Sequence, residues 1–174
     1  MTRQNDRPDG MTPSWRSMAS ADLAAVGALS ARIHPNYPER AEVLDEKFRL
    51  HPQGCFVLAS EDGTVGYCFS HPWLRGAVPA LDTFLGQLPV RPTTYHVHDL
   101  TLDAGLRGQG HGRAVVPLLF ECARSLGIPH LSLVAVNRRG RFWQAAGFVR
   151  TADEALQATT RAKYGDAVHM ERPL

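Results

Sequence analysis

Apolar positions along the chain recur with two different periods. Residues 94–102 (TYHVHDLTL) alternate between apolar and polar side chains, which predicts a β-strand buried on one face. Residues 55–60 and 64–70 are apolar runs joined by a Glu-Asp-Gly turn, a pattern typical of a β-hairpin. The continuous apolar run 130–136 predicts a central strand. Shorter strands are expected at 14–18, 148–151 and 167–173.

Other segments have apolar residues at three- and four-residue spacing, which predicts helices. Pro117 removes a backbone donor near the start of one of them and predicts a kink there. The proline-containing stretch 71–92 predicts a loop with room for one helical turn. The order of elements favours an α/β domain, with helices flanking a mixed sheet of about seven strands. The expected helices are 21–34 with Ser20 as N-cap, 39–50, 113–126 and 140–147.

Length and composition restrict the class of protein. The 174 residues suit one domain, expected over 14–174, and the polar residues 1–13 are expected to be a disordered tail. A formal net charge of +2 is too small to favour nucleic acid or an anionic membrane as partner. No apolar run approaches the roughly 20 residues that cross a bilayer, and the first residues lack the apolar core of a signal peptide. The three cysteines show no Cys-x-x-Cys spacing, so a reducing, cytoplasmic location is expected.

Glycines stand at alternate positions between the strand 94–102 and the helix that follows it. Gly108, Gly110 and Gly112 come after Arg107. Glycine permits positive φ and lets a ligand approach the backbone, so that successive amides can face one anion. No Lys-Ser/Thr pair follows, which excludes a Walker P-loop, and Arg113 stands where the dinucleotide-binding pattern requires glycine. The turn therefore predicts a phosphate or pyrophosphate site, the alternative being a glycine-rich turn without a ligand.

The pattern R/Q-x-x-G-x-G/A, met by Arg107, Gly110 and Gly112, resembles the acetyl-CoA pyrophosphate loop of the GNAT acyltransferases. The strand LSLVAVN followed by RFWQAAGF resembles a later motif of that superfamily, and the closing YGDAVHMERPL resembles its last strand. The resemblance extends over residues 14–174. It implies a single GNAT-like domain, with a mostly antiparallel sheet in which the fourth and fifth strands splay apart.

The resemblance also implies where acetyl-CoA, the cosubstrate, would bind. Its pantetheine would lie between the splayed strands and bond to the backbone of Leu100 and Leu102, as an added strand would. Asn137 and Trp143 would contact it near the splay. The pyrophosphate would be held by the backbone amides of Arg107, Gly108, Gln109, Gly110, His111 and Gly112.

Two histidines, His96 and His98, precede the glycine turn on the predicted strand. Their pattern resembles the H-x-H of the arylalkylamine (serotonin) N-acetyltransferase branch, whose histidines relay protons from the amine. The ordinary pKa of histidine suits that task. Asp99 is expected on the opposite face of the strand unless a bulge intervenes. The alternatives are a purely structural role for the histidines, or a metal site, for which no third ligand of suitable spacing is present.

Many members of the superfamily place a tyrosine, able to protonate the departing thiolate, four residues before a Gly-Phe pair. That position is Trp143 here, and an indole N–H cannot supply a proton. Tyr164, expected in the loop between the last two strands, is the candidate acid, with packing or covering the substrate as its alternative role. Arg138, Arg139 and Arg141 either meet the 3′-phosphate of CoA or form a solvated helix start.

The sequence thus predicts an acetyl-CoA-dependent N-acetyltransferase. The acceptor is expected to be a primary amine of a small molecule, which attacks the thioester directly in a ternary complex without a metal cofactor. Three alternatives stay open: a CoA-binding regulatory module without catalysis, an enzyme that acetylates protein or peptide amines, and a metal-dependent hydrolase built on His96, His98 and Asp99. The resemblance leaves a homodimer open.

Overall fold

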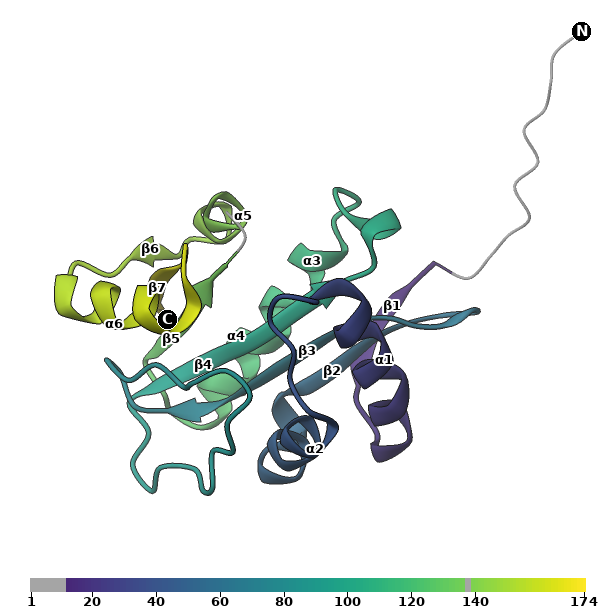
Figure 1. Ribbon diagram of the computed structural model, residues 1–174, viewed down its shortest axis with the longest axis horizontal. Coiled ribbons are helices and arrows are strands. Elements are labelled where there is room, and N and C mark those ends of the chain that lie inside the picture. The colour runs from purple at the N-terminus through teal and green to yellow at the C-terminus, as the bar shows by residue number, and fades with distance from the viewer. Residues whose placement is uncertain (1–11, 137–138) are drawn as a thin grey trace, which may run out of the picture.

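The computed structural model describes residues 12–136 and 139–174, which form a seven-stranded sheet with helices on both faces (Figure 1). The expected tail over 1–13 lies almost entirely outside these residues. The strands are β1 (Ser14–Ser17), β2 (Cys55–Ser60), β3 (Gly63–Trp73), β4 (Thr94–Leu102), β5 (His130–Ala135), β6 (Val149–Arg150) and β7 (Val168–Pro173). The helices are α1 (Leu23–Ile33), α2 (Ala41–Leu50), α3 (His111–Ala114), α4 (Val116–Ser125), α5 (Gly140–Ala145) and α6 (Glu154–Tyr164).

The strand order is β1-β2-β3-β4-β5-β7-β6, and neighbouring strands are antiparallel except for β4 and β5. This confirms the α/β fold with a mixed, mostly antiparallel sheet. The parallel ladder joins residues 95–97 of β4 to residues 131–133 of β5. Beyond Val97, β4 continues to Leu102 with β3 as its only strand partner among the described residues. The fourth and fifth strands therefore separate at this point, as predicted.

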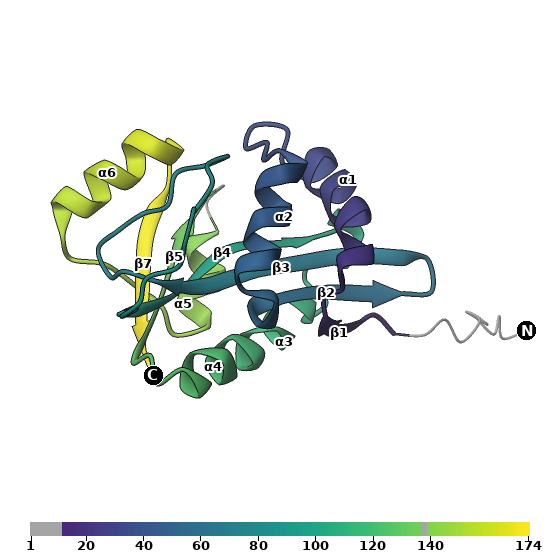
Figure 2. The same cartoon turned by 90° about the horizontal axis from the view of Figure 1, so that it is seen from below.

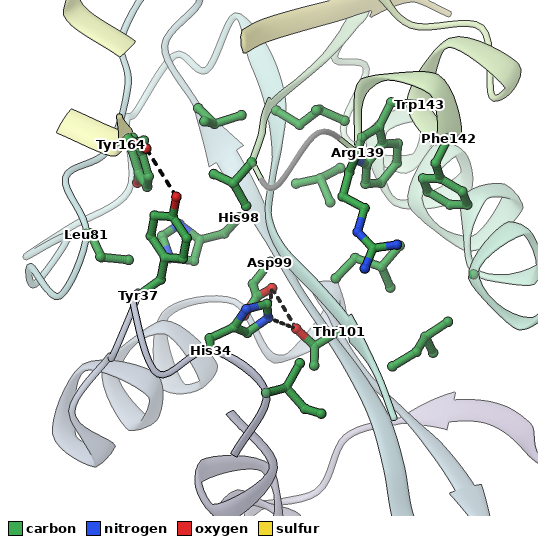
Figure 3. Close-up of a pocket in the computed structure, with 18 of the residues that line it drawn as sticks. His34, Tyr37, Leu81, His98, Asp99, Thr101, Arg139, Phe142, Trp143 and Tyr164 are labelled. Carbon is green, nitrogen blue, oxygen red and sulfur yellow. Dashed lines mark hydrogen bonds and ion pairs between the residues drawn. The ribbon is translucent and has the colours of Figure 1, made fainter. Parts of the chain in front are cut away.

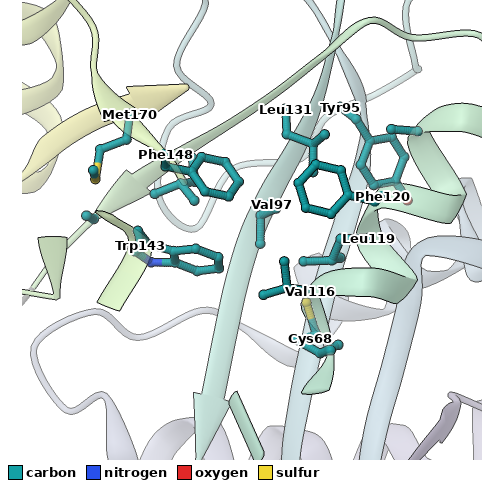
Figure 4. Packing of buried hydrophobic residues seen from close by; sticks show 14 of the residues in the cluster. Cys68, Tyr95, Val97, Val116, Leu119, Phe120, Leu131, Trp143, Phe148 and Met170 are labelled. Carbon is teal, nitrogen blue, oxygen red and sulfur yellow. The ribbon is translucent and has the colours of Figure 1, made fainter. Parts of the chain in front are cut away.

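Both faces of the sheet are covered, which explains why its central strands are apolar throughout. Helices α1 and α2 lie over one face, and α3 and α4 lie over the other (Figure 2). On the second face, Tyr95 and Val97 of β4 pack in one cluster with Leu119 and Phe120 of α4 and with Trp143 of α5 (Figure 4). The cluster on the first face contains Met18, Val26, Leu29, Leu44, Cys55, Val57, Tyr67 and Phe69.

The start of one helix differs from the sequence prediction, and the start of another agrees with it. Ser20 is not the N-cap of α1, because a 3-10 turn over Ser20–Asp22 precedes the helix and the Asp22 carboxylate accepts a hydrogen bond from the Ala19 amide (2.8 Å). The kink at Pro117 is confirmed: α3 ends at Ala114 and α4 begins at Val116. Proline has no N–H to continue the ladder of the preceding turn.

The connection between β6 and β7 contains helix α6, which the sequence pattern did not predict. Its buried side chains are Leu156, Gln157 and Thr160, so only one of the three is apolar and the helical period is masked. Asp153 caps the helix by accepting from the Leu156 amide (3.0 Å). Tyr164 accordingly stands at the end of a helix rather than in a loop. None of the helices in the described part of the chain is long and apolar enough to cross a bilayer.

The β3–β4 loop (residues 74–93) contains no helical turn, contrary to the expectation for this stretch. It is nevertheless fixed to its surroundings by side chains of α2, α6 and the α1–α2 connection. The bonds run from Lys163 Nζ to the Val78 carbonyl (2.6 Å), from Tyr164 Oη to the Pro79 carbonyl (2.7 Å), from the Leu85 and Gly86 amides to the Glu46 carboxylate (2.7 and 2.9 Å), and from Arg40 to Asp82 (2.9 Å).

The fold leaves no space for a side chain at Gly54, which lies against Tyr95 near the start of β4. A Cβ there would lie 2.2 Å from the Ser70 carbonyl oxygen and 2.4 Å from Tyr95 Oη. Gly54→Ala should therefore lower the free energy of unfolding by about 1–3 kcal/mol in urea titrations, because the backbone of β3 must move. Gly27→Ala is the matched control: its Cβ meets open space in α1, and the change should stabilise by about 0.5–1 kcal/mol. Equal effects of the two changes would contradict this account.

Candidate active site

A pocket opens where β4 leaves β5, and it brings together segments that are far apart in the sequence (Figure 3). Residues 96–102 of β4 form its floor. The α1–α2 connection, the β3–β4 loop and the end of α6 contribute Tyr37, Glu39, Leu81 and Tyr164. The glycine turn and α5 contribute Arg107, Gly112, Arg139, Phe142 and Trp143.

The glycine turn adopts the backbone geometry that its sequence predicts. Gly108 and Gly110 have φ of +80° and +89°, which favours glycine, and a Cβ on Gly112 would lie 3.2 Å from the Phe142 ring. The amides of residues 108–112 find no hydrogen-bond acceptor among the described residues. Two side chains steady the turn: the indole N–H of Trp15 donates to the His111 carbonyl (2.7 Å), and Gln109 Nε2 donates to the Gly105 carbonyl (2.7 Å). The turn is thus a fixed set of unsatisfied donors.

The edge of β4 that faces β5 carries free backbone groups beyond Val97. The Asp103 amide donates to the Val65 carbonyl in β3 (2.8 Å). Because backbone groups alternate between the two edges of a strand, those of Leu100 and Leu102 point away from β3 and into the gap. Both residues line the pocket.

A bulge in β4 changes which side chains face the pocket. Phe69 of β3 pairs with Asp99 and Ser70 pairs with Val97, so His98 is an extra residue in β4. A bulge shifts the alternation of side chains by one position. His98 and Asp99 therefore both line the pocket, although they are neighbours in the sequence (Figure 3).

His96 is completely enclosed. Its Nδ1 lies 3.0 Å from Ser132 Oγ, and its ring centroid is 5.7 Å from that of His71 and 6.2 Å from that of His98. Burial, followed by the neighbouring histidines, holds the pKa of His96 well below its usual value. The ring is therefore neutral at physiological pH and a weak base.

His98 forms a buried pair with Glu39, which the sequence reasoning did not identify as a site residue. Its Nε2 lies 3.1 Å from Glu39 Oε2, and Lys47 Nζ lies 2.9 Å from Oε1 of the same carboxylate. Burial opposes ionisation of Glu39, but the charges and hydrogen bonds of His98 and Lys47 outweigh it and lower the pKa of Glu39 to about 2. The Nδ1 of His98 has no partner among the described residues.

Asp99 lies in a second polar group on the same wall of the pocket. Tyr67 Oη donates to Asp99 Oδ2 (2.6 Å), and Thr101 Oγ1 donates to Oδ1 (3.0 Å). His34 Nε2 contacts Thr101 Oγ1 and lies 3.8 Å from Asp99 Oδ1. Asp99 keeps 21% of its side-chain surface exposed.

Two aromatic residues from the sequence prediction line the pocket in different ways. Trp143 is buried against Phe142 and Phe148, with ring centroids 4.8 and 5.3 Å apart. The Tyr164 hydroxyl donates to the Pro79 carbonyl, and burial, followed by the charges of Glu39 and Asp99, raises the pKa of Tyr164. The tyrosine hydroxyl is thus already engaged with the β3–β4 loop.

Of the remaining predicted site residues, Asn137 and Arg138 lie outside the described part of the chain. Arg139 lines the pocket beside Trp143, whereas Arg141 is exposed and does not belong to its lining (Figure 3). Within residues 12–136 and 139–174, no three His, Cys, Asp or Glu side chains are grouped so that they could hold a metal ion.

Residues 19–148 match the acetyltransferase (GNAT) family, which is most of the folded chain. The chain belongs to this family. Its members transfer an acyl group from an acyl-CoA to an amine, so acetyl-CoA is the cosubstrate and the protein is a transferase. No curated protein matches the chain in sequence.

Solved structures of GNAT proteins have the same fold at low sequence identity. The loading GNATL domain of CurA from Lyngbya majuscula superposes with a TM-score of 0.77 and 16% identity, over 93% of this chain and 98% of that one. N-acetylglutamate synthase from Neisseria gonorrhoeae, complexed with coenzyme A and N-acetyl-glutamate, gives 0.66 and 15%, over 94% of this chain and 35% of that one. The ribosomal-protein-S18-alanine N-acetyltransferase from Escherichia coli gives 0.62 and 18%, over 93% and 94%.

The low pKa of Glu39 predicts how the stability of the fold depends on pH. A carboxyl whose pKa is lower in the folded state than its ordinary 4.5 stabilises the fold above that pH, and this contribution is lost as the pH falls through about 5 toward 2. Glu39→Gln should be less stable than wild type at pH 7, by about 3 kcal/mol, because Lys47 is left buried without a counter-charge. The difference should narrow as the pH is lowered.

Urea unfolding at pH 3, 5 and 7 measures this difference. Asp45→Asn, which removes an exposed carboxylate paired with Arg49 on α2, is the control and should change stability little at any pH. A difference between wild type and Glu39→Gln that is constant over this range would show that the carboxylate charge does not stabilise the fold.

Proposed function

We propose that the protein acetylates a primary amine of a small molecule by direct attack in a ternary complex. The observation that supports this best is that one pocket joins two kinds of group. The free amides of the glycine turn and the free edge of β4 lie at one end, and the His98–Glu39 pair lies at the other. A thioester and an amine bound at these two ends would meet over β4.

The residues present fit acetyl-CoA. The amides of residues 108–112 are oriented donors for a pyrophosphate, and Arg107 adds a positive charge beside them. The free backbone N–H and C=O groups of Leu100 and Leu102 could hydrogen-bond to the amides of pantetheine, as they would to an added strand. Trp143 and Phe142 supply an apolar wall, and Arg139 is a second cation at this end.

His98 is the proposed base. A primary amine with a pKa near 10.4 is almost entirely protonated at pH 7, with about one molecule in 2,500 neutral, so a proton must leave before attack. When Nε2–H donates to Glu39, the lone pair of the enclosed Nδ1 is left to accept that proton, directly or through water, and the carboxylate stabilises the imidazolium that forms. His96 is the weaker candidate, because burial lowers its pKa and makes it a poorer proton acceptor, and we assign it to orienting the wall of the pocket through Ser132.

The departing thiolate does not require a protein acid in this proposal. Trp143 cannot release a proton, and Tyr164 is bonded to the Pro79 carbonyl. A thiol with a pKa near 8.5 gives a thiolate that leaves readily. Tyr164 is therefore assigned to covering the acceptor.

A small acceptor is favoured over a protein chain by the β3–β4 loop, which is tied down over the acceptor end by Tyr164 and Glu46. The H-x-H pair supports membership of the arylalkylamine N-acetyltransferase branch, because histidines at these positions suit proton transfer from an amine. A homodimer and a cytoplasmic location stay predictions.

Gly110→Asp tests the cosubstrate end. The carboxylate adds like-charge repulsion to a pyrophosphate, so we expect at least about tenfold weaker acetyl-CoA binding by titration calorimetry. Gly63→Asp is the matched control, because Gly63 also has a positive φ (+111°) and open surroundings but lies at the start of β3, next to the β2–β3 turn. Unchanged affinity in folded Gly110→Asp would exclude the glycine turn as the pyrophosphate site.

His98→Gln tests the base. We expect kcat/KM for an amine to fall by about 10²-fold at pH 7, and the loss to shrink as the pH approaches the pKa of the amine. His96→Gln should cost less, and His130→Gln, outside the pocket at the start of β5, should have little effect. The measurement is a pH–rate profile of each variant, with acetyl-CoA affinity in parallel. A loss that is uniform with pH would make His98 a positioning residue.

A further inference from the structure

The pocket has two halves with opposite charge. The cofactor half contains Arg107, Arg139, Phe142 and Trp143. The acceptor half contains His34, Tyr37, Glu39, Leu81, His98, Asp99 and Tyr164, and Figure 3 shows the labelled members of the two halves on opposite sides of β4. The arginines that line the pocket are confined to the cofactor half, whereas its carboxylates are confined to the acceptor half.

The two carboxylates of the acceptor half are not equivalent. Glu39 is 5% exposed and has its counter-charge within the fold, since Lys47 Nζ is 2.9 Å away and 1% exposed. Asp99 has no ion pair with Lys or Arg among the described residues. Its hydrogen bonds come from two neutral hydroxyls, Tyr67 Oη and Thr101 Oγ1. Unlike Glu39, Asp99 therefore has no Lys or Arg counter-charge within the described part of the chain.

The contact between His34 and Thr101 does not require a charged imidazole. Thr101 Oγ1 gives its proton to Asp99, so this oxygen accepts from the His34 ring, and Nε2–H is the donor. That bond needs only the neutral tautomer of the imidazole. At 3.8 Å, Nε2 also lies beyond hydrogen-bond distance of Asp99 Oδ1.

The acceptor half has the shape and chemistry for a short apolar stem with a charged end. Tyr37, Leu81 and Tyr164 provide the walls, and the Tyr37 hydroxyl is itself engaged with the Tyr164 carbonyl (3.3 Å). A carboxylate offers about four lone-pair sites, of which Asp99 uses two within the protein. The buried His98, with its unpartnered Nδ1, lies next to Asp99 because of the bulge.

We propose that Asp99 binds a second ammonium group of the acceptor, which makes the preferred acceptor an aliphatic diamine or polyamine. This rests on the proposed function, since the first amine is the one that His98 deprotonates. A second ammonium neutralises the partly buried carboxylate, whereas a carboxylate at the same place on the acceptor is repelled by it. Asp99 is thus a specificity residue and takes no part in the proton transfer.

Three amines of similar length test the proposal on the wild-type protein. Diaminobutane carries a second ammonium, pentylamine carries a methyl group in its place, and aminobutanoate carries a carboxylate. We expect kcat/KM for diaminobutane to exceed that for pentylamine by about 10- to 100-fold, the range for one hydrogen bond between charged groups. Aminobutanoate should be the poorest substrate.

Asp99→Asn then assigns the preference to one side chain. The hydroxyl of Tyr67 can turn to accept from the asparagine amide, so the fold is expected to persist, which thermal unfolding verifies. The variant should lose most of its activity with diaminobutane and retain that with pentylamine. Asp45→Asn removes a surface carboxylate and should change neither.

The outcomes separate this proposal from the one on which it rests. Equal use of diaminobutane and pentylamine by wild type would overturn the inference and leave the acetyltransferase intact. An equal loss with both amines in Asp99→Asn would also overturn it, because Asp99 would then act on the reacting amine or on the fold. Acetylation of none of the amines would contradict the proposed function itself, and the inference with it.

Discussion

The early end of the ladder between β4 and β5 is the constraint on which the rest of the site depends. An internal strand of a sheet uses both of its hydrogen-bonding edges, and an unpaired buried edge is costly. Beyond Val97 no strand of the described part of the chain lies beside this edge of β4, while Trp143 and Phe142 of α5 line the gap. Among the described residues, the backbone groups of Leu100 and Leu102 that point into the gap therefore have no strand partner and are open to solvent or a ligand. The pocket exists because the sheet is left incomplete at its centre.

The bulge at His98 adds chemistry to that gap. Without it, strand alternation would place His98 and Asp99 on opposite faces; with it, an imidazole and a carboxyl group stand side by side. Groups of this kind are expensive to remove from water. The fold offsets the cost for Glu39 with Lys47, whereas the hydrogen bonds that Asp99 accepts within the described residues come from two hydroxyls. This difference is the reason why we propose a cationic group of the acceptor as the partner of Asp99.

The sequence predicted the elements whose local pattern is strong. The strand 94–102 was obtained with its observed bounds, because alternation and the glycine turn mark both of its ends. Helix α6 was missed because its buried face includes Gln157 and Thr160, which pair with backbone groups rather than supplying an apolar stripe. Glu39 was missed for another reason: its partners His98 and Lys47 are eight or more positions away, and only the folded chain brings them together.

The hydrogen bond from Trp15 to the His111 carbonyl has a consequence for how the glycine turn comes into being. It joins residues 96 positions apart, from the edge strand β1 to the turn before α4. Closing a contact of such long sequence separation costs chain entropy, which the pairing of the intervening strands has to offset. The support of the turn therefore depends on the part of the sheet between β1 and β4. A peptide excised around residues 107–112 would carry the motif but lack the support that holds its amides in one orientation.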